Sequence, residues 1–260
     1  MFDNVPITRI YKDGNAKSKS INDKVVAEHA LTINLDKKEL VTLLCSPEKL
    51  EYLALGFLFS EGLIKGKEDL KEIVLDENQG VVEIAIAEHA NIAKGGEPKR
   101  LIGSSGGRGI SPPFLDHYKV KSEIIITPGE IFNLMEEFIH RSEIFEATGG
   151  VHSAALCNRQ HILVFSEDIG RHNAIDKVFG ECLLKALPTD DHIMITSGRV
   201  SSEIVNKVVK RNIPILISKS APTNRGVKLA EDLDITLIGF VRGERMNLYT
   251  HTGRIAYNKP

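Results

Sequence analysis

The sequence predicts an α/β fold in which a smaller N-terminal α+β domain precedes a larger α/β domain. Strand-like and helix-like segments alternate over residues 151–240, and the late strands are apolar on both faces. Such strands suit a sheet that helices cover on both sides. A glycine-rich stretch separates this half from the first. We therefore expect a flexible tail at 1–24, an α+β domain at 25–120 with a mobile loop at 88–113, and an α/β domain at 121–260.

The first half contains two pairs of predicted strands around one helix. The first twenty-odd residues are polar and are expected to be poorly ordered. The helix should run from Pro47 to about Gly62, because Ser46 is a good N-cap and proline suits the first helical turn. A turn at residues 78–80 predicts a hairpin. The strands are predicted at Val25–Leu35, Glu39–Cys45, Leu70–Leu75 and Val81–Ala87.

The second half opens with a helix-start signal at Thr127–Glu130, where Thr127 and Glu130 form a capping box and Pro128 takes the first helical position. Five strands and three helices are predicted after it. The strands are Val151–Cys157, His161–Phe165, His192–Thr196, Pro214–Ser218 and Thr236–Phe240, and the helices are Arg171–Leu187, Ser201–Asn212 and Asn224–Leu233.

Composition and charge exclude several classes of protein. The 260 residues include 33 Lys and Arg against 35 Asp and Glu, without the basic excess of a bulk nucleic-acid binder. No apolar run approaches the roughly 20 residues of a membrane span, and no secretory signal is visible. Three scattered cysteines are typical of buried thiols in a reducing cytoplasm. His152 and His172 lack a third ligand at suitable spacing, so no metal site is expected.

Four predicted strands are followed by turns of similar chemistry. Each turn combines small or hydroxyl residues with a cation, and the cations include Arg171, Arg199, Arg242 and Arg245. Small residues let the backbone approach a ligand, helix N-termini attract phosphate, and arginine grips phosphate oxygens in a fork. One such turn is usually only a helix cap. Four at the same sheet edge predict a site for a large phosphate-bearing ligand.

Two other functions stay open at this point. Asp168 and Asp176 flank His172 and suit general acid–base work, as in a nucleotide hydrolase or deaminase. The same carboxylates equally suit a helix cap or ion pairs with Arg171 and Lys177. An RNA-binding module is a third class, but the near-neutral charge and the absence of tryptophan weigh against it.

Several segments carry a family resemblance. They are Ala54–Gly62 (ALGFLFSEG), Gly149–Leu156 (GGVHSAAL), Glu167–Lys177 (EDIGRHNAIDK), Ser197–Arg199 (SGR), Ser220–Thr223 (SAPT) and Thr236–Gly243 (TLIGFVRG). Together they resemble the FdhD family of formate dehydrogenase accessory sulfurtransferases. The resemblance covers nearly the whole chain beyond the N-terminal tail, and the eleven-residue EDIGRHNAIDK segment is its most specific part.

The resemblance implies a three-layer, cytidine-deaminase-like second domain without the deaminase zinc. It implies a molybdenum or tungsten bis(molybdopterin guanine dinucleotide) cofactor as the bound client, with GDP as a mimic. The partners would be a cysteine desulfurase and formate dehydrogenase, and the chain would be a cytoplasmic homodimer. The implied cofactor-binding residues are Gly149, Gly150, His152, Asp168, Gly170, Arg171, His172, Asn173, Ser197, Gly198, Arg199, Ser218, Ser220, Ala221, Pro222, Thr223, Phe240, Val241, Arg242, Gly243, Glu244 and Arg245.

One loop departs from the family pattern. The family carries Cys-Gly-x-Cys-Gly in a mobile loop, and Ser105 and Arg108 stand here where the two cysteines should be. Persulfide chemistry needs a thiolate, which serine does not replace. Sulfurtransferase activity would then depend on another thiol, with Cys45 favoured because it precedes the first long helix. The alternative is a chaperone that binds and delivers the cofactor without carrying sulfur.

Overall fold

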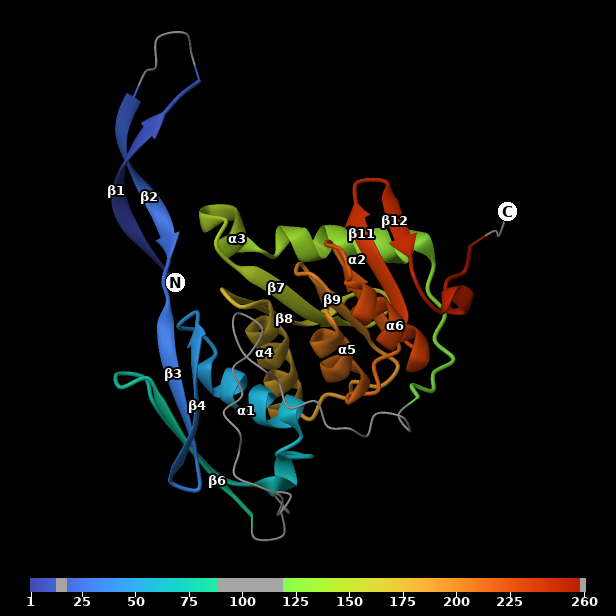
Figure 1. Ribbon diagram of the computed structural model, residues 1–260, viewed down its shortest axis with the longest axis horizontal. Coiled ribbons are helices and arrows are strands. Elements are labelled where there is room, and N and C mark those ends of the chain that lie inside the picture. The colour runs from blue at the N-terminus through green and yellow to red at the C-terminus, as the bar shows by residue number, and fades with distance from the viewer. Residues whose placement is uncertain (13–17, 88–118, 258–260) are drawn as a thin grey trace.

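The computed structural model describes residues 1–12, 18–87 and 119–257, which form three separate β-sheets (Figure 1). Within these residues, a two-stranded sheet lies at the N-terminus, a four-stranded sheet follows, and a six-stranded sheet forms the second half. The predicted Ser105 and Arg108 lie outside the described residues. No described helix is long and apolar enough to cross a membrane.

The six-stranded sheet has the order β12-β11-β10-β9-β7-β8. Its central strands β9, β10 and β11 run parallel, whereas β7 pairs antiparallel with both β8 and β9, and β12 folds back on β11. The mixed α/β architecture predicted from the sequence is therefore confirmed. The strands are β7 (His152–Cys157), β8 (Ile162–Asp168), β9 (Ile193–Thr196), β10 (Ile215–Ser218), β11 (Thr236–Arg242) and β12 (Arg245–Leu248).

Helices cover both faces of this sheet, because its strands are apolar on both faces. One buried cluster joins the sheet to α4, α5 and α6, and a second joins the opposite face to α2 (Figure 1). The Thr127–Glu130 capping box forms as predicted, with both of its hydrogen bonds present. The helices are α2 (Pro128–His140), α3 (Glu143–Thr148), α4 (Arg171–Leu184), α5 (Ser202–Val209) and α6 (Asn224–Asp232), with a short 3₁₀ turn at Thr252–Arg254.

The four-stranded sheet has the order β4-β3-β6-β5, and helix α1 packs on it. The predicted hairpin is confirmed, since β5 and β6 pair antiparallel. Helix α1 lies between this sheet and α4, so it buries residues around most of its circumference. The elements are β3 (His29–Leu35), β4 (Lys38–Cys45), α1 (Leu50–Glu61), a 3₁₀ turn at Lys67–Asp69, β5 (Leu70–Asp76) and β6 (Val81–Ile86).

Helix α1 begins at Leu50, three residues after the predicted start at Pro47. The reason is that Ser46 serves a contact with the second half of the chain. Its hydroxyl oxygen accepts a hydrogen bond from the Ile169 backbone N–H at 3.1 Å, and its own N–H donates to Asp168 at 3.0 Å. The side chain that the sequence predicts as a helix cap is therefore engaged elsewhere.

The two halves meet where α1 crosses α4. The crossing is close because both helices carry glycine there: a Cβ at Gly56 would lie 1.7 Å from the carbonyl oxygen of Asp176, and one at Gly180 would lie 1.9 Å from that of Tyr52. Buried ion pairs flank the crossing, with Lys177 Nζ 2.7 Å from Asp168. Further polar contacts across the interface are Ser60–Asp176, Lys49–Glu181, Lys177–Ser46, Lys210–Ser60 and Asn173–Leu44.

The expected flexible tail at 1–24 is wrong for its described residues, which form a β-hairpin. Strand β1 (Phe2–Ile10) pairs antiparallel with β2 (Ser18–Val26) over nine residue pairs. The predicted strand Val25–Leu35 is correspondingly divided between β2 and β3. The hairpin projects from the body, and the base of β2 packs against α3 and Gly150 (Figure 1). The exposed polar residues that suggested disorder are typical of a sheet with no layer on either face.

Candidate functional site

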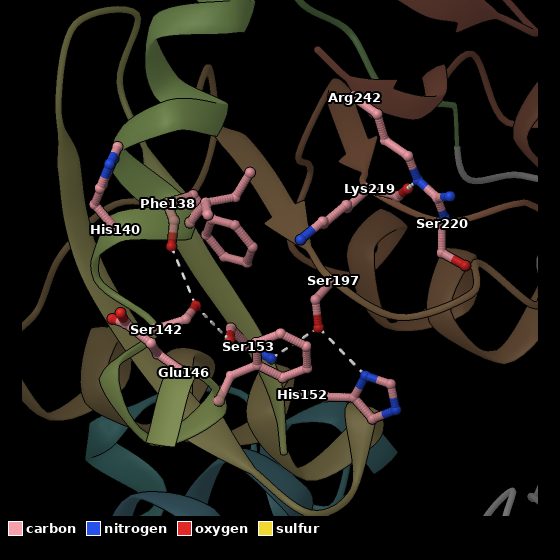
Figure 2. A pocket seen from close by; sticks show the side chains of 12 residues that line it. Phe138, His140, Ser142, Glu146, His152, Ser153, Ser197, Lys219, Ser220 and Arg242 are labelled. Carbon is pink, nitrogen blue, oxygen red and sulfur yellow. Dashed lines mark hydrogen bonds between the residues drawn. The ribbon is translucent and has the colours of Figure 1, made fainter. Parts of the chain in front are cut away.

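A cavity of about 460 Å³ lies where α2 and α3 meet the carboxyl ends of the parallel strands (Figure 2). β7 also reaches it, because β7 runs antiparallel to β9 and therefore starts where β9 ends. The lining residues are Phe138, Ile139, His140, Ser142, Phe145, Glu146, His152, Ser153, Ser197, Lys219, Ser220 and Arg242.

Four of the predicted ligand-binding residues meet in this cavity: His152, Ser197, Ser220 and Arg242. Ser197, Ser220 and Arg242 lie at the ends of three different strands, as expected for a site in an α/β sheet, and His152 lies at the start of β7. Lys219 is the cation that the sequence places in the turn after β10, although it was not among the residues predicted to bind the ligand. Sequence reasoning missed the wall supplied by α2 and α3, which includes Phe138, Phe145 and Glu146. No local sequence signal marks that wall, because its residues lie on helices and not at the ends of strands.

Two cations, Lys219 and Arg242, line the cavity together with the Glu146 carboxylate. The Nε of Arg242 donates to the Lys219 carbonyl oxygen at 2.8 Å, which fixes the turns after β10 and β11 to one another. Lys219 Nζ lies 5.7 Å from the centre of the Phe145 ring. Cations beside aromatic rings in a concave site suit a ligand that combines a phosphate with a planar group.

Hydrogen bonds fix the floor of the cavity. The Ser197 hydroxyl oxygen accepts from the Ser153 backbone N–H at 2.9 Å and lies 3.2 Å from His152 Nδ1. Ser142 and Ser153 pair through their hydroxyls at 2.8 Å. Burial and the nearby Arg171 lower the pKa of His152, although Asp168 opposes them. The imidazole is therefore neutral at pH 7.

A second group of predicted residues gathers beside the first, at the N-termini of α4 and α5. A Cβ at Gly198 would lie 2.8 Å from Arg171 Cβ, so the turns after β8 and β9 touch. Arg199 contributes to this group electrostatically, since it lowers the pKa of Arg171 after the larger effect of burial. Nε2 of His172 lies 3.6 Å from Glu203. Burial, Lys207 and Arg171 lower the pKa of His172 to about 3, so His172 is neutral.

The acid–base hypothesis for His172 is not supported by the placement of its two neighbours. The carboxylate of Asp168 is fully buried and pairs with Lys177. Asp176 is also buried, with Lys207 Nζ at 2.6 Å. Both carboxylates therefore serve as ion-pair partners inside the fold. Asp168, predicted to bind the cofactor, has no exposed surface with which to do so.

The remaining predicted residues shape the turns. Ser218 is buried and donates to the Gly198 carbonyl oxygen, and Thr223 caps α6. Gly149 ends α3 in the left-handed conformation. Gly150 packs against β2, Gly170 and Asn173 donate hydrogen bonds to Asp168, and Ala221 and Pro222 pair with Val200. In the turn after β11, Phe240 and Gly243 have positive φ, Val241 is buried, and Glu244 and Arg245 are exposed.

None of the three cysteines of the chain is exposed. Cys45, favoured as the alternative thiol because it precedes the first long helix, is not activated there. Burial, with a further contribution from Asp168, raises the pKa of Cys45 to about 12. Burial also raises the pKa of Cys157, and that of Cys182 to about 12. All three are buried neutral thiols, as their scattered spacing indicated. Within the described ranges, no group of three His, Cys, Asp or Glu residues is placed to hold a metal ion.

Residues 26–256 match the model of the FdhD/NarQ family. The chain belongs to this family. It is 41% identical over 249 residues to the sulfur carrier protein FdhD of Bacillus pumilus, covering 94% of each chain. It is 40% identical over 260 residues to that of Bacillus subtilis, covering 98% of this chain and 99% of the relative. The resemblance drawn from the EDIGRHNAIDK segment is therefore confirmed.

The fold agrees with this family assignment. A solved structure described as a formate dehydrogenase accessory protein, from Desulfotalea psychrophila, superposes with a TM-score of 0.79. It is 26% identical and the match covers 97% of this chain and 99% of that one. The FdhD/NarQ match begins at residue 26, so it leaves out nearly all of the β1–β2 hairpin.

Proposed function

We propose that this FdhD/NarQ protein acts in the maturation of formate dehydrogenase, and that its cavity binds the guanine dinucleotide part of a molybdenum or tungsten cofactor. The observation that carries the proposal is the meeting of Lys219, Arg242 and Phe145 at the strand ends. A nucleotide needs a cationic contact for its phosphates and a flat apolar wall for its base, and this cavity has both.

Calorimetry with GDP tests the binding proposal. GDP carries the base and the phosphates without the metal, so it isolates what the cavity recognises. We expect wild-type protein to bind GDP and Arg242→Ala to weaken binding about 10- to 100-fold, since charge-assisted hydrogen bonds contribute roughly 1.5–3 kcal/mol.

Arg159→Ala is the matched control for Arg242→Ala. Arg159 pairs with Glu130 at 2.7 Å and does not line the cavity, so GDP affinity should not change. Wild-type protein that gives no heat with GDP would contradict the proposal. Equal losses in the two arginine variants would assign the effect to overall charge.

The sulfur step distinguishes two forms of this function. The relatives are named sulfur carriers, and such a role needs a thiolate that a cysteine desulfurase can load. The three thiols here are buried and protonated, and the alternative is a protein that holds the cofactor without carrying sulfur on its own cysteine. Incubation with a cysteine desulfurase and ³⁵S-cysteine should leave the native chain unlabelled. Label on Cys45 would restore the sulfur-carrier form.

We further propose that the chain forms a homodimer through the β1–β2 hairpin. An isolated two-stranded hairpin is marginal in water, and one face of this hairpin carries Val5, Ile7, Ile21 and Val25. Val5 and Val25 are 38% and 44% exposed. Light scattering after chromatography should show a dimer for wild type and a monomer for the Val5→Lys/Ile21→Lys variant. Thr8→Lys, on the opposite face, should leave the dimer intact; a wild-type monomer would contradict the proposal.

The layer order of the second half of the chain supports a more specific proposal about its fold. A mixed sheet covered by α2 on one face and by α4, α5 and α6 on the other is the three-layer arrangement expected from a kinship with cytidine deaminases. We infer this kinship from the layer order. Structure comparison of residues 119–257 alone against solved deaminases tests it, and a superposition no better than with other three-layer folds would count against it.

A further inference from the structure

The contact between Ser197 and His152 at the floor of the cavity has a definite proton arrangement. The Ser197 hydroxyl has two neighbours, the Ser153 backbone N–H at 2.9 Å and His152 Nδ1 at 3.2 Å (Figure 2). The backbone N–H is always a donor. Ser197 therefore accepts from Ser153 through one lone pair, and its own single hydrogen is available for a second partner.

The second partner must be an acceptor if every group is to be satisfied. A neutral His152 with its hydrogen on Nε2 presents a lone pair at Nδ1, and the Ser197 hydroxyl then donates to it. A hydrogen on Nδ1 would instead point at Ser197, whose own hydrogen has no other partner among the described residues. The first arrangement satisfies both groups, and partly buried sites favour such full pairing.

The other ring nitrogen of His152 is open. Nε2 makes no hydrogen bond within the described part of the chain, and it is not a buried atom. It lies on the ring edge away from Ser197 (Figure 2). Burial and Arg171 keep the ring neutral by lowering its pKa. The residues that line the cavity thus include two cations (Lys219 and Arg242), one carboxylate (Glu146) and one neutral N–H donor (His152).

We propose that Ser197 is a positioning residue that holds His152 in the Nε2–H tautomer, so that His152 donates a hydrogen bond to an oxygen acceptor of the bound ligand. The acceptor is a phosphate or carbonyl oxygen, since Lys219 and Arg242 select for negative or electron-rich groups. This inference rests on the proposed nucleotide-binding function. Ser197, in the Ser-Gly-Arg turn after β9, would then contribute to ligand recognition indirectly, by orienting His152 on β7.

Nitrogen-15 NMR of histidine-labelled protein tests the tautomer without any ligand. The ring signals of His152 are assigned by their loss in His152→Gln. Wild type and Ser197→Thr should show a bare Nδ1 and a protonated Nε2. Ser197→Ala should show a mixture of tautomers, because Nδ1 has lost its donor. Ser153→Ala is the matched control, since it removes a neighbouring hydroxyl but keeps the backbone N–H. A wild-type proton on Nδ1, or an unchanged tautomer in Ser197→Ala, would overturn the proposal.

GDP calorimetry on the same variants tests the consequence for binding. Ser197→Ala should weaken GDP binding about 5- to 10-fold, the effect of one hydrogen bond, whereas Ser197→Thr should stay within about 2-fold of wild type. Equal affinities for Ser197→Ala and wild type would overturn the role in recognition. Absence of GDP binding in wild type would refute the proposed function, and the NMR result would then still decide the positioning of His152.

Discussion

The crossing of α1 and α4 permits a sharp prediction, because two glycines bring the backbones together. In Gly56→Ala, the new methyl group would lie 1.7 Å from the Asp176 carbonyl oxygen and 2.9 Å from the Gly180 nitrogen. Real contacts of this kind are no closer than about 3.0 Å, so the helices must separate by more than 1 Å. Neither obstacle is a flexible side chain that can turn away. The strain therefore falls on the interface between the two halves.

The size of the loss follows from what the separation breaks. Overpacking costs roughly 1–3 kcal/mol. The Ser60–Asp176 bond at 2.6 Å and the Lys177–Ser46 bond at 3.2 Å would both lengthen, at about 1 kcal/mol each. Alanine recovers about 1 kcal/mol through its higher helix propensity. The net loss is about 2–4 kcal/mol, or a fall in Tm of roughly 5–15 °C for a chain of this size.

Differential scanning calorimetry of Gly56→Ala measures this loss, with Gly129→Ala as the control. Gly129 also lies in a helix, but a Cβ there meets nothing within 4 Å, so only the gain in helix propensity applies. We expect Gly129→Ala to leave Tm unchanged or raise it slightly. If Gly56→Ala melts at or above the wild-type temperature, the crossing tolerates a methyl group and the reasoning from backbone contact is refuted.

Three further predictions concern buried polar groups. Lys177→Met should cost about 3–5 kcal/mol in urea denaturation, since it leaves the Asp168 carboxylate buried and unpaired, and Asp168→Asn in the same chain should restore part of the loss. The pKa of His172 is lowered from 6.5 to about 3 in the folded protein, so the unfolded chain binds more protons as the pH falls below 6.5. The free energy of unfolding should therefore drop by about 2 kcal/mol between pH 6.5 and 5. His172→Asn should reduce this dependence of stability on pH. Thiol reagents should modify Cys45, Cys157 and Cys182 only after unfolding, and rapid labelling of the native chain would contradict their burial.

Local signals predicted the elements whose residues interact with their sequence neighbours. The Thr127–Glu130 capping box needs only three residues of separation, and it forms as predicted. The start of α1 was predicted wrongly because Ser46 bonds to Ile169, 123 residues away. The β1–β2 hairpin was missed because most of its residues are polar and exposed, so the short apolar alternation at Val5 and Ile7 is a weak strand signal.

The candidate site was predicted only in part, because some of its residues are brought together by tertiary packing. Ser220 and Arg242 were found because parallel strands end at one edge of the sheet, whereas His152 was implied by the family resemblance. Phe145 and Glu146 come from the short helix α3, whose place over that edge depends on tertiary packing against β2 and β8. Asp168 is the opposite case. Its position after a strand predicted a ligand contact, but burial beside Lys177 gives it a place in the interface.

Helix α4 takes part in both the interface between the two halves of the chain and the candidate site. Its first residues, Arg171 and His172, belong to the group beside the cavity, and its middle carries Lys177 and Gly180 against the first half of the chain. The Asp168 carboxylate that precedes it accepts from the Ser46 backbone, so both units hold the start of this helix. The larger unit alone would lose these contacts. We therefore expect a chain of residues 119–260 to fold less stably than the full protein and to bind GDP more weakly, and equal GDP affinity would show that the first half contributes nothing to the site.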